Sequence, residues 1–181
     1  MPRSARRPVS GPAAEPASGA LAPRTWHGIS YRPCQAGAIE VRRLFRFAGA
    51  WAPSLEAHEL AWEAESEGRV LGGVLAERRG AHAFAHGPVV VEPPAGVEPI
   101  AIADQLVAAL LTQAAAVGLD TLFARPQGLD RVWVRAGFVP VPEATLPADL
   151  RDRPGAGLHA WRRPGTYHVA TPDAEAGRRR R

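Results

Sequence analysis

Two pairs of titratable side chains in this sequence have a spacing that could support chemistry. His82 and His86 are four residues apart, and on a helix two histidines at this spacing can chelate a metal ion. The surrounding "AHAFAHG" is typical of a β-strand, on which the two imidazoles lie about 13 Å apart, so we expect no metal site. Glu63 and Glu65 lie on one face of another expected strand, and a solvated strand face is the simplest interpretation of them.

The other reactive residue types exclude several mechanisms. The single cysteine, Cys34, rules out an internal disulfide and a cysteine-rich metal cluster. It has no evident histidine partner, so we expect a buried, unreactive thiol rather than a nucleophile. The sequence has no lysine, which excludes mechanisms that depend on a Schiff base or a P-loop lysine.

The stretch "GPVVVEPPAGVEPIAIADQLVAALL", residues 87–111, predicts a strand, a proline-rich loop and the start of a long helix. Such an arrangement commonly binds a phosphate, because free N–H groups and the helix dipole point at the ligand. Loops of this kind normally carry glycines that let the backbone approach the ligand. This one has one glycine, three prolines and two glutamates, so it either binds a phosphorylated ligand or keeps only the frame of such a site.

Composition indicates one domain with a sizeable core, because 46% of the 181 residues are hydrophobic. We expect a disordered tail at 1–24, the domain at 25–164 and a disordered basic tail at 165–181. The longest apolar stretch, within 106–117, is interrupted by polar residues, so no membrane span is expected. The N-terminus has arginines but no apolar segment typical of a secretory signal, and we expect a cytoplasmic protein.

The distribution of charge argues against a nucleic-acid partner, although the pI is about 10.4. The formal net charge is +4, of which +3 lies in residues 1–24 and +2 in residues 165–181. The body between them therefore carries about −1, which is a poor electrostatic match for a polyanion.

The order of the expected elements indicates a mixed α and β domain. Residues 60–91 alternate in polarity and contain turn signals at Glu67-Gly68 and Arg79-Gly80, which predicts an antiparallel meander of three strands. Gly72-Gly73 is a candidate bulge in the central strand. We further expect a strand at 27–34, a helix at 36–49, a strand at 119–126, a short helix at 128–137, and closing strands in "FVPVP" and "LHAWRR".

The long helix is the element that the sequence predicts most strongly. Pro99 suits its first turn and Gly118 its C-terminal end. Its apolar residues form a single stripe that should pack across a sheet. These residues are Ala103, Leu106, Val107, Leu110 and Ala114.

Three segments in this order resemble the GNAT superfamily of acyl-CoA-dependent acyltransferases. They are "EGRVLGGVLAE", "GPVVVEP" with the loop and helix that follow it, and "VWVRAGFVPV". The resemblance covers residues 29–163. It implies an α+β fold, or α/β in three layers, with a GNAT-like mixed and mostly antiparallel sheet flanked by helices.

The resemblance also implies acetyl-CoA as co-substrate. The pantetheine would pair with the strand at 89–91, and the pyrophosphate would lie at the N-terminus of the long helix. Against the family pattern "(Q/R)-x-x-G-x-(G/A)-x-x-L", Ala101 replaces a glycine and Glu98 replaces a donor or cation, an anionic change that costs about 1 kcal/mol. The residues implied in cofactor binding are Val89, Val90, Val91, Glu98, Ala101, Ile102, Ala103 and Arg135.

For catalysis, the resemblance implies His86 as the base, beside the Gly87-Pro88 break, and Glu63 as a second base or an anchor for the amine. Trp133 stands where many members have a tyrosine acid; an indole cannot supply a proton, and core packing is the alternative. The segment from Gly137 to Pro154 resembles amino-acid-acetylating members. Trp51, Trp62 and Trp161 are candidates for the lining of an acceptor pocket, with core packing as the simpler alternative.

The function implied is acetyl transfer from acetyl-CoA to a small primary amine or amino acid by direct attack, without a metal. The alternative is a catalytically inactive GNAT-fold module with a protein-binding or regulatory role. Family members are often dimers, so a homodimer is also open.

Overall fold

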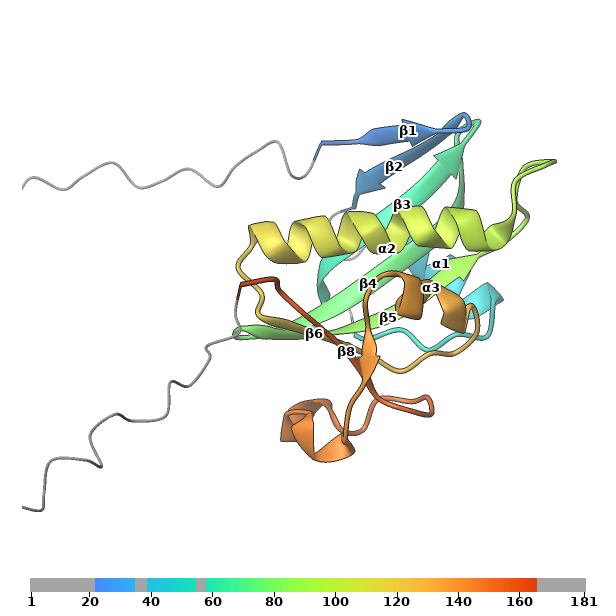
Figure 1. The fold of residues 1–181 in the computed structure, drawn as a ribbon. Helices are drawn as coiled ribbons and strands as arrows, with labels where there is room; N and C mark the ends of the chain where they lie inside the picture. The colour runs from blue at the N-terminus through green and yellow to red at the C-terminus, as the bar shows by residue number, and fades with distance from the viewer. Residues whose placement is uncertain (1–21, 35–38, 55–57, 166–181) are drawn as a thin grey trace, which may run out of the picture.

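The computed structural model describes residues 22–34, 39–54 and 58–165. Within these residues one sheet of eight strands has the order β1-β2-β3-β4-β5-β6-β8-β7, and neighbouring strands are antiparallel except for the parallel pair β5–β6. Helices α2 and α3 cover one face and α1 the other (Figure 1). The predicted mixed, mostly antiparallel sheet in three layers is confirmed.

The elements follow one another along the chain in the predicted order, with β1 as an additional strand at the start. The strands are β1 (Arg24–Trp26), β2 (Ile29–Pro33), β3 (His58–Ser66), β4 (Arg69–Arg79), β5 (His82–Val90), β6 (Thr121–Ala124), β7 (Val139–Pro140) and β8 (His159–Arg162). The helices are α1 (Ile39–Phe47), α2 (Pro99–Ala116) and α3 (Asp130–Arg135), with short 3₁₀ helices at Glu143–Thr145 and Ala148–Leu150.

The meander of β3, β4 and β5 is antiparallel as predicted. Its first turn falls on Glu67 and Gly68, both of which have positive φ angles (52° and 77°), as in the two-residue turns that match the twist of a hairpin. The strand predicted at 27–34 is wrong in one respect. His27 and Gly28 form a second turn of the same kind, which divides β1 from β2.

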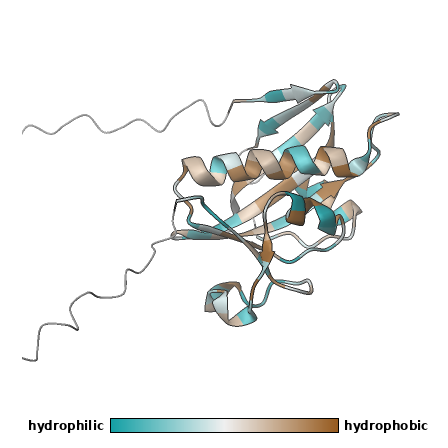
Figure 2. Ribbon diagram, in the orientation of Figure 1, coloured by the Kyte–Doolittle hydropathy of each residue, from teal (hydrophilic) through white to brown (hydrophobic). Residues whose placement is uncertain are grey.

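Helix α2 has the predicted ends and the predicted buried stripe. Pro99 occupies its first position, and the chain turns at Gly118 with a φ of 75°. Gln113 is buried beside this stripe because its Oε1 accepts a hydrogen bond of 2.8 Å from Trp62 Nε1 on β3. By length and composition alone α2 could cross a membrane; its apolar residues pack on the sheet, which accounts for that composition (Figure 2).

Helix α1 packs on the opposite face. The sequence places Ile39, Leu44 and Phe47 near helical spacing, and of these only Leu44 is buried, while Ile39 and Phe47 are 63% and 76% exposed. Val41 and Phe45 are buried beside Leu44. The first three residues of the predicted 36–49 helix lie outside the described residues. Close approach of α1 to β4 depends on a glycine, because a Cβ at Gly73 would lie 2.7 Å from Val41 Cγ1.

We therefore expect Gly73→Ala to lower the free energy of unfolding by about 1–3 kcal/mol, as overpacking does in a close-packed core. Val41 is fully buried and β-branched, so it cannot move aside freely. Chemical denaturation of the two single variants and of the double variant with Val41→Ala measures the coupling. The double variant should be more stable than the sum of the single changes by about 1 kcal/mol, and simple additivity would contradict this packing.

Candidate active site

The candidate site begins where β5 and β6 diverge. Their parallel pairing runs from His82 opposite Thr121 to Ala85 opposite Ala124, where β6 ends. Strand β5 continues to Val90, and over this part it remains paired with β4. The edge of β5 from residue 86 to 90 is therefore not paired with β6, so an extended ligand can add to it as a strand would.

A β-bulge lies at the same point. Gly73 is opposite Val89 and Leu75 is opposite His86, so two steps along β4 match three steps along β5. The additional residue falls at Gly87-Pro88, whose peptide bond is cis. Because a bulge changes the alternation of side chains, His86 and Val89 both point to the face that carries α1. The bulge was predicted at Gly72-Gly73 on β4. At this pair of strands, the additional residue lies instead on β5, beside that position.

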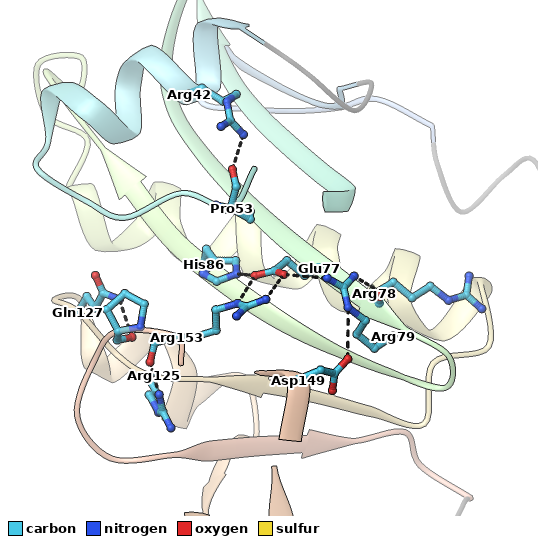
Figure 3. Close-up of polar contacts among 11 residues, drawn as sticks. Arg42, Pro53, Glu77, Arg78, Arg79, His86, Arg125, Gln127, Asp149 and Arg153 are labelled. Atoms are coloured by element: carbon cyan, nitrogen blue, oxygen red, sulfur yellow. Dashed lines mark hydrogen bonds and ion pairs between the residues drawn. The ribbon is translucent and has the colours of Figure 1, made fainter. Parts of the chain in front are cut away.

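The His86 side chain contacts a buried carboxylate. Glu77 on β4 is fully buried, and its Oε1 lies 2.7 Å from His86 Nε2. Arg153 donates from Nε to Oε1 and from Nη2 to Oε2, both at 2.7 Å. Arg79 Nη2 reaches Oε2 at 3.4 Å, and Figure 3 shows these groups converging on Glu77. The cluster of Glu77, His86, Arg79 and Arg153 is called the Glu77 cluster below.

Arg153 comes from the irregular segment 141–158, which returns across the end of β4 and β5. Leu146 and Leu150 of this segment pack on Phe84. Arg125, after β6, donates to the carbonyl oxygens of Arg151 and Arg153. The backbone that carries Arg153 is thus held on two sides, which fixes the guanidinium against Glu77.

Aromatic rings enclose His86. The Trp51 ring lies 4.8 Å from the imidazole and the Phe84 ring 5.0 Å, centroid to centroid. The Arg153 guanidinium lies 5.7 Å from the Trp51 ring centroid. His86 is only 3% exposed, whereas Trp51, which packs against its ring, is 39% exposed.

The charge of Glu77 is stabilised within this cluster. Burial by itself raises the pKa of a carboxyl group, but the hydrogen bonds from Arg153 and His86 outweigh burial and lower the pKa of Glu77 to about 2. Glu77 is therefore ionised at neutral pH. Among the described residues no group of three His, Cys, Asp or Glu side chains could hold a metal ion.

No protein-family model and no curated protein sequence matches the chain. Solved structures do match. N-acetylglutamate synthase from Neisseria gonorrhoeae, in complex with coenzyme A and N-acetyl-glutamate, has a TM-score of 0.57 at 17% identity over 76% of this chain and 36% of its own. A putative acetyltransferase of the GNAT family from Desulfovibrio desulfuricans has a TM-score of 0.53 at 15% identity over 74% of this chain and 98% of its own.

A putative acyl-CoA N-acyltransferase from Klebsiella pneumoniae has a TM-score of 0.58 at 14% identity over 73% of this chain and 95% of its own. The chain has the GNAT acetyltransferase fold. It spans about a third of the length of the N-acetylglutamate synthase structures and nearly the whole of the other two proteins.

The residues predicted to bind the cofactor lie where β5 and β6 diverge and near the N-terminus of α2. Val89 is buried on the α1 face, Val90 packs toward α2, and the Val91 N–H donates to the Leu71 carbonyl. Glu98 is the N-cap of α2 and its side chain makes no capping hydrogen bond. Their role in binding coenzyme A stays a prediction.

Two backbone N–H groups in the first turn of α2 already donate hydrogen bonds within the helix. The N–H groups of Ala101 and Ile102 both donate to the Glu98 carbonyl, at 3.0 and 3.4 Å. The side chains of Ile102 and Ala103 are fully buried in the core. Any contribution of these residues to a pyrophosphate site would therefore come from their backbone. Arg135 pairs with the second turn of α2, with its Nη1 3.0 Å from Asp104 Oδ2.

The second predicted base, Glu63, is not adjacent to His86. Its Oε1 accepts a hydrogen bond of 2.6 Å from Arg32 Nε, and Arg32 also pairs with Glu65. Glu63 is on the α1 face but two strands and two residues away from His86, which puts their Cα atoms roughly 12 Å apart. Glu63 thus belongs to a separate polar group on β2 and β3.

Two other singled-out residues have the structural roles weighed for them. Trp133 is fully buried and its ring packs edge-on against Phe138 at 4.8 Å, which is core packing. Cys34 is partly rather than fully buried; this burial raises the pKa of its thiol to about 12, with the Glu63 charge adding to the effect, which disfavours the reactive thiolate.

Sequence analysis missed Glu77 and Arg153 as site residues, and it weighed Trp51 as an acceptor-pocket side chain against core packing. Glu77 lies in "LAERRG", which has the form of a charged strand end at a turn, and only its position in the sheet reveals its burial. A tryptophan such as Trp51 is more often core. A weak signal was available: Glu77 is the only acidic residue in the strand "RVLGGVLAERR", and otherwise this strand has arginines only at its two ends.

The low pKa of Glu77 predicts how stability depends on pH. A lowered folded-state pKa stabilises the protein above the ordinary value of 4.5, and this stabilisation is lost as the pH falls from 4.5 toward 2. Glu77→Gln, which removes the buried carboxylate from the partly buried Arg153, should cost about 3–5 kcal/mol at pH 7.

The difference in unfolding free energy between wild type and Glu77→Gln should narrow as the pH falls below 4.5. Urea denaturation between pH 7 and pH 3 measures it. Glu40→Gln is the matched control, because its exposed pair with Arg43 contributes about 0–1 kcal/mol. A constant difference for Glu77→Gln across this range would contradict the assignment of an ionised, stabilising carboxylate.

Proposed function

We propose that the protein is an N-acetyltransferase that transfers an acetyl group from acetyl-CoA to the primary amine of a small molecule or amino acid. One observation carries this proposal: His86 is the first residue of β5 beyond the last pair with β6, directly before the bulge. A thioester bound along the unpaired edge of β5 would lie beside it. The similarity of the fold to acetyltransferases solved with coenzyme A supports the choice of co-substrate.

The reaction is a direct displacement. The amine nitrogen attacks the thioester carbonyl carbon, the new C–N bond forms, and the C–S bond breaks with loss of the coenzyme A thiolate. The amine proton passes to the His86 imidazole, directly or through a water molecule, and the thiolate takes a proton from solvent. Because His86 is enclosed, the acceptor would approach past Trp51.

An amino-acid acceptor has some support from the comparisons. The similar N-acetylglutamate synthase structure contains N-acetyl-glutamate, a product whose amine belonged to an amino acid. Trp51 and Arg153 would be the acceptor-facing side chains nearest to His86.

A second candidate, a GNAT-fold module that no longer catalyses transfer, is favoured by the loop before α2. Glu98 puts a negative charge at the N-cap, and Pro99 removes one N–H from the first turn. Both features oppose a pyrophosphate at that helix end.

Isothermal titration of acetyl-CoA and coenzyme A into the full chain tests the loop. We expect binding in the wild type, and about fivefold tighter binding for Glu98→Gln, since removing an anion near the pyrophosphate recovers about 1 kcal/mol. Glu67→Gln removes the same charge from the exposed β3–β4 turn and should leave the affinity unchanged. The absence of binding to wild type and to Glu98→Gln would contradict the enzyme and favour the inactive module.

Steady-state release of coenzyme A with a panel of amines and amino acids tests the base. His86→Gln should lower kcat about 10²–10⁴-fold while the affinity for acetyl-CoA stays within about twofold. Glu63→Gln, whose side chain pairs with Arg32, should lower kcat less than tenfold. Equal losses in the two variants, or an unchanged His86→Gln enzyme, would exclude His86 as the base.

A further inference from the structure

The Glu77 cluster assigns an orientation to the His86 side chain. We propose that Glu77 is a positioning residue for the acetyl transfer, whose carboxylate holds the His86 imidazole with its proton on Nε2, so that Nδ1 is the atom that receives the proton of the amine. This inference rests on the proposed function for its catalytic part. The tautomer itself can be measured without any assumption about activity.

The four contacts of the carboxylate decide the direction of the hydrogen bond. Oε1 is approached by His86 Nε2 and Arg153 Nε, and Oε2 by Arg153 Nη2 and Arg79 Nη2. An ionised carboxylate only accepts hydrogen bonds and has about four lone-pair sites, while guanidinium groups only donate. The His86 Nε2 at 2.7 Å must therefore be the donor, and the other ring nitrogen is the basic one.

The ring cannot easily turn over to exchange its two nitrogens. Trp51 and Phe84 pack against it at 4.8 and 5.0 Å. In the sheet, Glu77 is opposite Phe84, so it is a diagonal neighbour of His86 on the same face. Backbone pairing and aromatic packing thus hold the imidazole at the carboxylate.

Arg153 makes this arrangement depend on the 141–158 segment. It supplies two of the four hydrogen bonds that keep Glu77 ionised and oriented, and it is the cluster member that comes from outside the meander. Arg79 in turn pairs with Asp149 of the same segment, at 3.4 Å (Figure 3). The position of the base is therefore coupled to a segment far away in the sequence.

The first experiment is long-range ¹H–¹⁵N NMR of the histidine side chains in the full chain. His86→Gln identifies the His86 signals among the six histidines. We expect a protonated Nε2 and an unprotonated Nδ1 above the pH at which the ring is charged. An Nδ1-protonated His86 in the wild type would overturn the proposal. This test of the tautomer requires only the wild type and the variant used for assignment.

The second experiment compares Glu77→Gln with the control Glu40→Gln. Glu77→Gln should lose the Nε2-protonated preference, lower kcat about 10–100-fold and leave the KM for acetyl-CoA unchanged. Among the side chains that the structure describes, the charged groups of the cluster around His86 are Glu77, Arg79, Arg153 and, beyond Arg79, Asp149. Because the variant removes the anion that contacts the imidazole, the acidic limb of the pH–rate profile should move to lower pH.

Arg153→Lys keeps a cation beside Glu77 and serves if Glu77→Gln does not fold. It should retain the Nε2-protonated tautomer with a loss in kcat below tenfold. An unchanged tautomer in folded Glu77→Gln, or a mixed tautomer in Arg153→Lys, would contradict the role of Glu77. A wild type without transferase activity would contradict the proposed function instead, and the NMR spectra would still decide whether Glu77 fixes His86.

Discussion

The buried carboxylate of Glu77 is the interaction on which the site depends. A charge removed from water is costly unless it is paired and fully hydrogen-bonded, and here four donors supply that pairing. The donors come from β4, from β5 and from the segment after β7. One carboxylate therefore ties the central meander, the residue at the bulge and the C-terminal part of the domain together.

Near this charge, the sheet has both an unpaired edge of β5 and the buried side chain of His86. The short strand β6 ends at Ala124, so the edge of β5 becomes available for pairing just where the bulge begins. Glycine at 73 lets α1 approach β4 beside the bulge, while Trp51, in the segment after α1, covers His86. An imidazole enclosed by aromatic rings is shielded from bulk water, which strengthens its electrostatic contacts.

Much of the fold could be predicted because its signals are local. Alternating polarity and turn residues defined the β3–β5 meander, and Pro99, Gly118 and one apolar stripe defined α2. The helix α1 was harder, since its nine residues contain apolar side chains on more than one face, and only packing selects Val41, Leu44 and Phe45 over Ile39 and Phe47. The His27-Gly28 turn was missed because it interrupts a short alternating run.

The sequence by itself determined the order of elements, the GNAT-like frame and the position of His86 beside the Gly87-Pro88 break. These depend on the periodicity and residue types of neighbouring positions. The tertiary structure alone decided that Glu77 is buried, that Arg153 pairs with it from 76 residues away, and that Glu63 lies apart from His86. Such pairings depend on the register of the strands and on a distant segment that packs back against them. The local sequence around each residue gives no signal of these contacts.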